Sequence, residues 1–310
     1  MIKQTLCFDN PAYLSAKNEQ LIIKTSDGRE ISRPIEDIGV VILDNPQITI
    51  TQNAVIKLLQ NNAAVIHCNE KHLPVGMLFN LDGNTLQSQK FKSQISATEV
   101  LKKNLWQQTV KAKIQNQAAV LKIAGKDSRR LDHLAKNVKP GDSGNYEAQA
   151  AIWYWNLVFS DYVENFSRIF TIGGVVNNML DYGYAVMRAA VARALTGSGL
   201  LPTLGIFHRN QYNAYCLADD IMEPFRPFVD LAVLEILQEN SIDSLQEINR
   251  GIKQKLLLVL QCDCFFKKEK SPLLVALTRT TASLCACFEG KKRKILYPEI
   301  KHEPKRDKSV

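Results

Sequence analysis

The sequence has 310 residues, of which 45% are hydrophobic and 23% charged, with a formal net charge of +8. Its length predicts about two domains, and its composition is that of a folded globular protein, which excludes a wholly disordered, collagen-like or fibrous chain. The apolar runs fall short of the ~20 residues that a membrane span needs, so we expect no membrane-embedded part.

The chain start and the cysteines indicate a cytoplasmic protein. No charged segment followed by an apolar core stands at the N-terminus, as a signal peptide would require. The seven cysteines are an odd number in a chain large enough to build its own core, so we expect reduced thiols.

The net charge is concentrated in two segments. Residues 90–140 carry twelve Lys or Arg against three acids, a net charge of +9. Residues 291–310 carry +5, so the rest of the chain sums to −6. A protein that grips a polyanion with part of its surface shows this pattern, and so does a solvated helix face followed by a flexible tail. Nucleic acid is one of two open interpretations.

Strand signals fill the N-terminal part of the chain. The predicted strands are short and apolar, and they lie at 21–25, 29–32, 40–43 and 64–66. Asp27-Gly28 supplies the positive φ of a tight hairpin turn between the first two, and Thr51 can cap a short helix. We therefore expect residues 1–88 to form a small β domain with one packed helix.

From Thr98 onward the apolar residues recur with the period of a helix. Thr98 can cap the first helix, and later glycines and prolines divide the remainder into several more. We expect residues 89–97 to be a linker, 98–290 an all-α domain without strands, and 291–310 a charged, disordered tail. The predicted fold class is α+β: a small N-terminal β domain followed by a larger all-α domain.

Cys262, Cys264, Cys285 and Cys287 form two Cys-x-Cys pairs that could supply four thiolates. One intervening residue is fewer than the usual spacing of structural zinc ligands, so we expect buried free thiols on two helices. A zinc or thiol protein built on these pairs stays an alternative, and it predicts stoichiometric zinc in the purified protein.

Two carboxylates and one imidazole stand out in the helical part. Glu147 opens an apolar helix after a turn, His208 lies in a Gly-Ile-Phe-His-Arg segment, and Glu223 shares a helix face with Asp220. Each has an ordinary structural explanation: a helix N-terminal carboxylate, a hydrogen-bonded core histidine, and the polar end of an amphipathic helix.

The spacing of His208 and Glu223 decides whether these groups could cooperate. On one continuous helix their separation would be about 22 Å at ~1.5 Å per residue, too far for a shared ion. Residues 209–213 are polar and weakly helical, and we place a break there. With this break, two carboxylates and a neutral imidazole can converge on a divalent cation, and oxygen-rich ligation suits Mg²⁺ or Mn²⁺.

Four segments in this order and spacing carry a resemblance. They are residues 141–148 (GDSGNYEA), 178–184 (NMLDYGY), 199–208 (GLLPTLGIFH) and 217–227 (LADDIMEPFRP). Together they resemble the CRISPR-associated integrase family, the first of the numbered Cas proteins. Residues 222–227 (MEPFRP) look most like members that accompany type II systems. The resemblance covers essentially the whole chain.

The resemblance implies a fold and a site. The family has an N-terminal β domain, here residues 1–88, dimerises, and has a helical catalytic domain, here residues 98–290. The implied catalytic residues and metal ligands are Glu147, His208 and Glu223, and Asp220 matches an acidic position that supports the site in some members. The implied cofactor is Mg²⁺ or Mn²⁺.

The resemblance also implies an activity and partners. The activity is metal-dependent DNA integration and cleavage in CRISPR adaptation, in which the 3′-hydroxyl of a short DNA fragment attacks a phosphodiester at the edge of the CRISPR repeat. The partners are double-stranded DNA with 3′ ends, repeat DNA, a second copy of the chain, the small ferredoxin-like second numbered Cas protein and the type II effector nuclease. A non-catalytic DNA-binding scaffold is the alternative.

Several basic side chains are candidates for phosphate contacts, which are mostly independent of sequence. They are Lys126, Arg129, Arg130, Arg209 and Arg226. Arg226 stands between Phe225 and Pro227, where pairing with a carboxylate of the helical domain competes with a phosphate contact. Tyr146, beside Glu147, is a candidate for stacking on a splayed base, and packing at the helix start explains it equally well.

Overall fold

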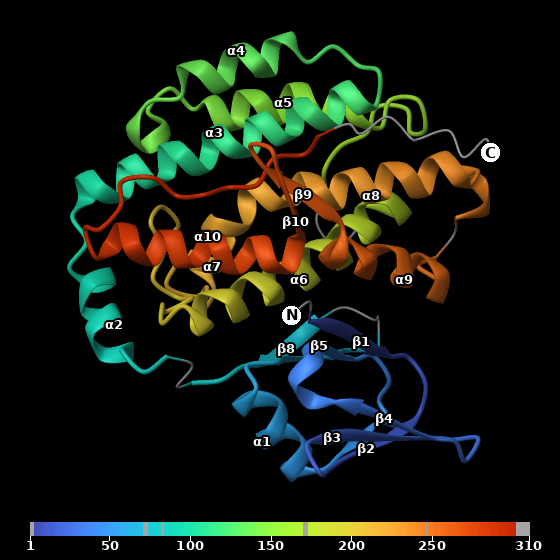
Figure 1. The fold of residues 1–310 in the computed structure, drawn as a ribbon. Coiled ribbons are helices and arrows are strands. Elements are labelled where there is room, and N and C mark those ends of the chain that lie inside the picture. Colours follow the sequence, from blue (N-terminus) through green and yellow to red (C-terminus); the bar gives the residue numbers. More distant parts are fainter. Residues whose placement is uncertain (1–2, 71–73, 82–83, 170–172, 246, 302–310) are drawn as a thin grey trace.

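The computed structural model describes residues 3–301, apart from 71–73, 82–83, 170–172 and 246. A β domain lies below a larger helical domain, and the chain passes between them through α2 (Gln87–Ile95) at one edge of the molecule (Figure 1). Strands come first and helices dominate the rest, which confirms the predicted fold class.

Two four-stranded sheets build the β domain. One has the order β1-β5-β7-β8 and contains β1 (Gln4–Phe8), β5 (Ile38–Leu43), β7 (Ala64–Cys68) and β8 (Pro74–Leu78). The other has the order β4-β3-β2-β6 and contains β2 (Ala12–Lys17), β3 (Gln20–Thr25), β4 (Glu30–Pro34) and β6 (Thr49–Ile50). The predicted turn joins β3 to β4, and Gly28 adopts a φ of +83° there.

Strand β5 is buried on both faces and contributes side chains to the cores of both domains. Its parallel neighbours are β1 and β7, and alternate side chains of a strand point to opposite faces. Val40 and Ile42 belong to the core of the helical domain. Val41 and Leu43 pack in the core between the sheets and α1 (Gln52–Gln60). A single sheet therefore supplies one wall of each core.

The long helix α3 (Glu99–Ile123) contacts α4, α5 and α8. The helices that follow α3 are α4 (Arg129–Asn137), α5 (Tyr146–Val158), α6 (Gly174–Gly197), α7 (Cys216–Met222), α8 (Arg226–Glu239), α9 (Arg250–Leu258) and α10 (Leu273–Phe288), with short 3-10 turns η2 (Pro140–Asp142), η3 (Glu223–Phe225), η4 (Ile242–Ser244) and η5 (Val259–Gln261). Thr51 and Thr98 cap α1 and α3 as predicted, since each side chain accepts a backbone N–H three residues on. None of the helices in the described ranges is long and apolar enough to cross a bilayer.

Two expectations about the chain's organisation were wrong. The expected linker at 89–97 is mostly helix α2, whose buried Gln94 bonds the backbone of Leu201 and Leu204. Its polar sequence gave no apolar stripe, and the helix is held in part by polar side chains: Lys90 also donates to the Ser198 carbonyl at 3.0 Å. Strands also return in the helical domain as the hairpin β9 (Asp263–Phe266) and β10 (Glu269–Pro272), which is too short to give a clear alternation.

The expected disordered tail was also wrong for residues 291–301, which lie along α3 (Figure 1). Asn116 of α3 donates to the Pro298 carbonyl at 3.1 Å and accepts from the Ile300 N–H at 3.1 Å. Ile295 and Ile300 are buried in the helical core. The expectation of disorder came from the high charge of the segment, which begins with four basic residues at 291–294. The apolar residues that follow them anchor the segment in the core. Residues 302–310 lie outside the described residues.

Candidate active site

Glu147 lies in the first turn of α5, and the turn before it fixes its backbone. The Asp142 carboxylate accepts hydrogen bonds from the N–H groups of Tyr146 at 2.9 Å and Glu147 at 3.0 Å. These bonds satisfy two N–H groups that every helix start leaves free. A Cβ on Gly144 would lie 2.3 Å from the Tyr146 ring, so this ring packs on its own turn. That contact supports the packing explanation for Tyr146.

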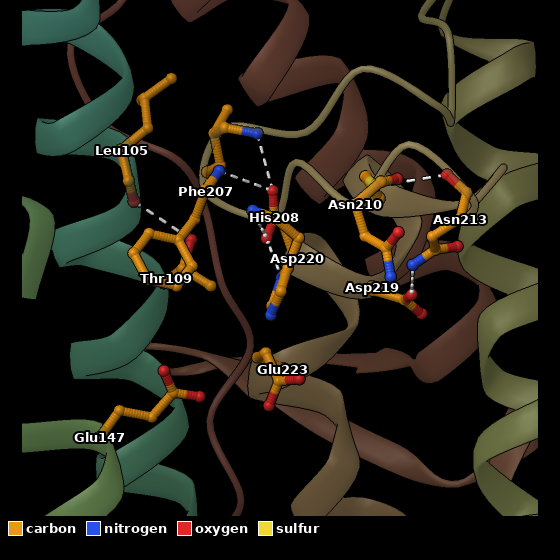
Figure 2. A network of polar contacts seen from close by, with 12 residues as sticks. Leu105, Thr109, Glu147, Phe207, His208, Asn210, Asn213, Asp219, Asp220 and Glu223 are labelled. Atoms are coloured by element: carbon orange, nitrogen blue, oxygen red, sulfur yellow. Dashed lines mark hydrogen bonds and ion pairs between the residues drawn. The ribbon is translucent and has the colours of Figure 1, made fainter.

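Asp220 fixes the loop that carries His208. Its fully buried carboxylate accepts hydrogen bonds from the backbone N–H groups of Ile206, Phe207 and His208, at 2.7, 2.9 and 3.2 Å. The same carboxylate lies 2.5 Å from His208 Nδ1 (Figure 2). A proton on Nδ1 leaves Nε2 as the electron-pair donor of a neutral ring. Asp220 thus orients the imidazole, as expected of a supporting residue.

The predicted break between His208 and Glu223 is confirmed. Residues 209–215 are not helical, and α7 begins only at Cys216. Phe207 stacks on Trp106 with ring centroids 4.2 Å apart, which ties the loop to α3. Glu223 consequently lies beside the His208–Asp220 pair, and Glu147 faces it from α5 (Figure 2).

Lys113 of α3 joins the two carboxylates. Its Nζ lies 2.7 Å from Glu147 Oε1 and 2.5 Å from Glu223 Oε2. Arg226 Nε donates to the other oxygen of Glu223 at 2.9 Å. Burial raises the pKa of Glu223, but the charges of Arg226 and Lys113 outweigh burial, so the pKa is lowered and the carboxylate is ionised.

His208 interacts electrostatically with both carboxylates. Its hydrogen bond to Asp220 raises the pKa of the imidazole, while burial lowers it. The negative charges of Asp220, Glu223 and Glu147 raise it further, and the pKa lies above its ordinary value. The structure therefore brings the three predicted site residues into one electrostatic environment.

The donor set suits a divalent cation in its chemistry. Two carboxylates and an imidazole nitrogen are ligands that Mg²⁺ or Mn²⁺ accepts. Glu223 Oε2 is buried and accepts no hydrogen bond, apart from its ion pair with Lys113. Within the described ranges, however, no three His, Cys, Asp or Glu side chains converge closely enough to hold a metal ion. The ammonium of Lys113 lies between the carboxylates, and the ligand roles stay a prediction.

Two grooves include residues of α3, and the smaller of the two is lined by His208. One, of about 460 Å³, opens beside His208 and includes Arg209 and Asn210 in its lining. The other, of about 1060 Å³, runs between α3 and the C-terminal segment. Its basic side chains are Lys111, Lys292, Arg293 and Lys294. Lys111 of the first basic segment and three residues of the second, far apart along the chain, therefore line one groove, which we call the basic groove.

The structure does not gather the predicted DNA contacts in one place. Arg226 pairs with Glu223 and lies over the Tyr184 ring at 4.6 Å, which is the carboxylate pairing that competes with a phosphate contact. Only Arg209 adjoins His208, where it is exposed and pairs with Glu99.

The other predicted contacts lie away from Glu147. Lys126 pairs with Asp161, beyond the C-terminal end of α5, at 2.5 Å. Arg130 lies over the Trp153 ring at 4.9 Å. Arg129 is exposed and pairs with Asp127. These side chains belong to the opposite end of α5 from the candidate site.

Sequence reasoning missed Lys113, Asn116 and Asp142. Lys113 follows Trp106 and Thr109 along the inward face of α3, at helical spacing, and Asn116 continues this face. A charged residue at such a position was the available signal. Asp142 stands in a Gly-Asp turn just before a helix, which indicates a capping carboxylate.

The cysteine pairs do not form a metal site. Cys262, Cys264, Cys285 and Cys287 are free, and the part of the chain that the structure describes contains no cluster that could hold a metal. Burial raises the pKa of Cys262 and Cys264 to about 12, so both are neutral thiols near pH 7. Cys264 lies on strand β9, so the expectation of two helices was wrong for the first pair.

Comparison with known proteins identifies the family. The family model described as CRISPR associated protein Cas1 matches residues 6–251. A relative from Neisseria meningitidis serogroup C, named CRISPR-associated endonuclease Cas1, is 38% identical over 303 residues, 97% of each chain. One from Pyrobaculum aerophilum with the name CRISPR-associated endonuclease Cas1 2 is 26% identical over 239 residues, 74% of this chain and 80% of the relative. The chain belongs to the Cas1 family, as the sequence motifs indicated.

Solved structures share the fold. A casposase bound to its integration product superposes with a TM-score of 0.78 at 20% identity, over 99% of this chain and 96% of the casposase. A Cas1 protein from Thermotoga maritima gives 0.75 at 14% identity, over 93% of this chain and 98% of its own. At these identities the likeness shows the fold alone.

Proposed function

We propose that this chain is a metal-dependent DNA integrase and endonuclease of CRISPR adaptation. It would join the 3′-hydroxyl ends of short DNA fragments to the CRISPR repeat by transesterification. The observation that carries the proposal is that Lys113 joins Glu147 to Glu223 and that both carboxylates act electrostatically on a His208 oriented by Asp220. The endonuclease name of the Neisseria relative and the integration product of the casposase support it.

We propose that Glu147, Glu223 and Nε2 of His208 hold Mg²⁺ or Mn²⁺. When bound, the cation would polarise a phosphoryl oxygen and lower the pKa of the attacking hydroxyl. The chain's own groups prepare this site. Asp220 sets the tautomer of His208, and Arg226 holds one oxygen of Glu223.

The proposed reaction exchanges one phosphodiester for another. The 3′ oxygen of the fragment forms a bond to a phosphorus of the repeat, and the bond from that phosphorus to the repeat's own 3′ oxygen breaks. The attacking hydroxyl loses a proton and the leaving 3′ oxygen gains one. The number of phosphodiesters is unchanged, so no nucleotide hydrolysis is needed.

We propose that DNA lies along the basic groove toward the candidate site. Lys111 and residues 292–294 would contact phosphates and carry no sequence information themselves. Arg209, next to His208, would contact the DNA closest to the reaction.

The proposed partners follow from the family. A chain of a Cas6-RT-Cas1–Cas2 complex shares the fold with a TM-score of 0.73 at 19% identity, over 96% of this chain and 36% of that chain. We propose that this chain likewise assembles with Cas2, forms a homodimer through residues 1–88, and receives fragments chosen with the type II effector nuclease.

A joining assay tests the function. A short duplex and a supercoiled plasmid with the repeat are incubated with the wild-type protein and with E147Q, H208A or E223Q, each with and without Cas2 and Mn²⁺. We expect joining by the wild type only, while all four proteins bind DNA. Joining by the three variants would overturn the site, and DNA binding by the wild type without joining in any metal would favour the non-catalytic scaffold.

A further inference from the structure

Lys113 occupies the space between Glu147 and Glu223. Its ammonium lies 2.7 Å from one carboxylate and 2.5 Å from the other, the distances of direct charge-assisted contacts. The side chain is only 13% exposed, so water screens these contacts little. The same two carboxylates are those proposed to hold the divalent cation.

The carboxylates are already neutralised in this arrangement. Glu223 has two cationic partners, because Arg226 Nε lies 2.9 Å from its other oxygen. Two negative charges thus meet two positive ones at contact distance in a mostly buried site. A divalent cation placed on the same carboxylates would be repelled by any cation that stayed there.

Lys113 is the cation that can leave. Arg226 is held by Glu223 and also by the face of the Tyr184 ring. The ammonium of Lys113 has ion pairs with the two carboxylates alone among the described residues. Its flexible four-carbon stem and strongly hydrated ammonium make withdrawal toward solvent easier than for a guanidinium.

We propose that Lys113 is a built-in competitor for the divalent cation. In the metal-free protein it holds Glu147 and Glu223 side by side, and it withdraws when the cation binds. This inference rests on the proposed function, because it assumes that these carboxylates are metal ligands. Lys113 is then a positioning residue that acts through the two carboxylates and weakens the affinity of the site for metal.

The withdrawal can be measured on the wild-type protein. Reductive methylation of lysines is followed by mass spectrometry with and without saturating Mg²⁺. We expect labelling of Lys113 to rise about tenfold with Mg²⁺, as a buried ion-paired amine becomes solvated. Lys122, exposed on the same helix, is the internal control and should not change. Unchanged labelling of Lys113 while Mg²⁺ is bound would overturn the inference.

Metal affinity gives a second readout. Titration calorimetry with Mn²⁺, without DNA, compares the wild type, K113Q and the matched variant K122Q. We expect K113Q to bind Mn²⁺ about tenfold more tightly or better, because a competing buried charge is gone, and K122Q to match the wild type. The labelling experiment needs no variant, so it decides the question even where K113Q does not fold.

Mn²⁺ binding by E147Q and E223Q distinguishes a wrong metal site from a wrong role for Lys113. If neither weakens Mn²⁺ binding, or if the wild type binds no Mn²⁺, the proposed metal site itself is wrong. If both weaken it and K113Q binds no more tightly than the wild type, the metal site stands and only the competition by Lys113 is wrong.

Discussion

The carboxylate of Asp220 lies 2.5 Å from Nδ1 of His208 and accepts three backbone N–H groups of the loop that carries this histidine. One buried side chain thus sets both the path of the loop and the orientation of the imidazole. Each carboxylate oxygen accepts two hydrogen bonds. A neutral side chain of the same shape has one oxygen and cannot accept all four.

Asp220→Asn should therefore impair both stability and the site. Its amide NH₂ would face N–H donors, so we expect the free energy of unfolding to fall by ~1–3 kcal/mol. Loss of a group that orients a metal ligand typically weakens metal affinity about 10- to 100-fold. Denaturant unfolding and Mn²⁺ titration check both values. Asp263→Asn, at an exposed position of strand β9, is the control, and an unchanged Mn²⁺ affinity in folded D220N would contradict the orienting role.

Asp230 predicts a pH dependence of stability. Burial raises its pKa to about 6, although Tyr184, Tyr154 and the charge of Arg226 oppose the rise. An unfolded Asp has a pKa of about 3.9. The folded state therefore binds this proton more tightly, so its contribution to stability is present below about pH 4 and is lost as pH rises to about 6.

The Asp230 contribution is measurable with Asp230→Asn. The rise of the Asp230 pKa on folding corresponds to ~3 kcal/mol of stability at low pH, and D230N lacks this contribution. The free energy of unfolding of the wild type minus that of D230N is compared at two pH values. We expect this difference to be ~2–3 kcal/mol larger at pH 4.5 than at pH 7.5. Denaturant unfolding at the two pH values checks this, and an equal loss at both would show that Asp230 does not titrate in this range.

The basic groove predicts the salt dependence of DNA binding. Replacing exposed Lys292, Arg293 and Lys294 by Gln should weaken DNA binding. The slope of log affinity against log salt concentration should also become shallower, by about 0.9 for each phosphate that the protein no longer neutralises. The pair R129Q and R130Q, at the far end of α5, should change the slope less. Fluorescence anisotropy over a salt series checks this, and identical slopes for the two sets of variants would exclude the groove as the DNA path.

A buried ion pair between the domains predicts coupling. Lys253 Nζ of α9 lies 2.7 Å from Asp44 Oδ2, which follows β5, and these side chains are 7% and 0% exposed. Removing one partner leaves a buried charge, so K253M should lower the free energy of unfolding by ~3–5 kcal/mol. The double variant with D44N should lose clearly less than the sum of the single variants. Additive losses in this double-mutant cycle would show that the pair is not coupled.

Much of the fold could be predicted because it depends on local patterns. The Asp27-Gly28 turn, the caps Thr51 and Thr98, and the switch from strands to helices each follow from a few adjacent residues. Helix α2 and the hairpin β9–β10 could not be predicted in this way. The first buries the single amide of Gln94 rather than an apolar stripe, and the second is too short to show a period.

The candidate site was predictable only in its outline. Motif spacing selected Glu147, His208 and Glu223 as candidates, and the break between the last two residues followed from helix geometry. Lys113 was counted among the basic residues of a surface, since charge along a chain does not show which side chains point inward. The partners of Arg226 and Asn116 are 3 and 182 residues away in sequence, and only the folded chain shows the second.

Asn116 has a consequence for when the site is completed during synthesis. Its amide NH₂ donates to the carbonyl of Pro224, next to Glu223, and to that of Pro298, and its oxygen accepts the N–H of Ile300. Two of these three bonds join α3 to residues 182 and 184 positions later in the sequence, so they can form only after residue 300 has left the ribosome. The full hydrogen-bonding of Asn116, whose amide also supports the backbone beside Glu223, therefore requires residues 298–300, and a chain that ends before them lacks it.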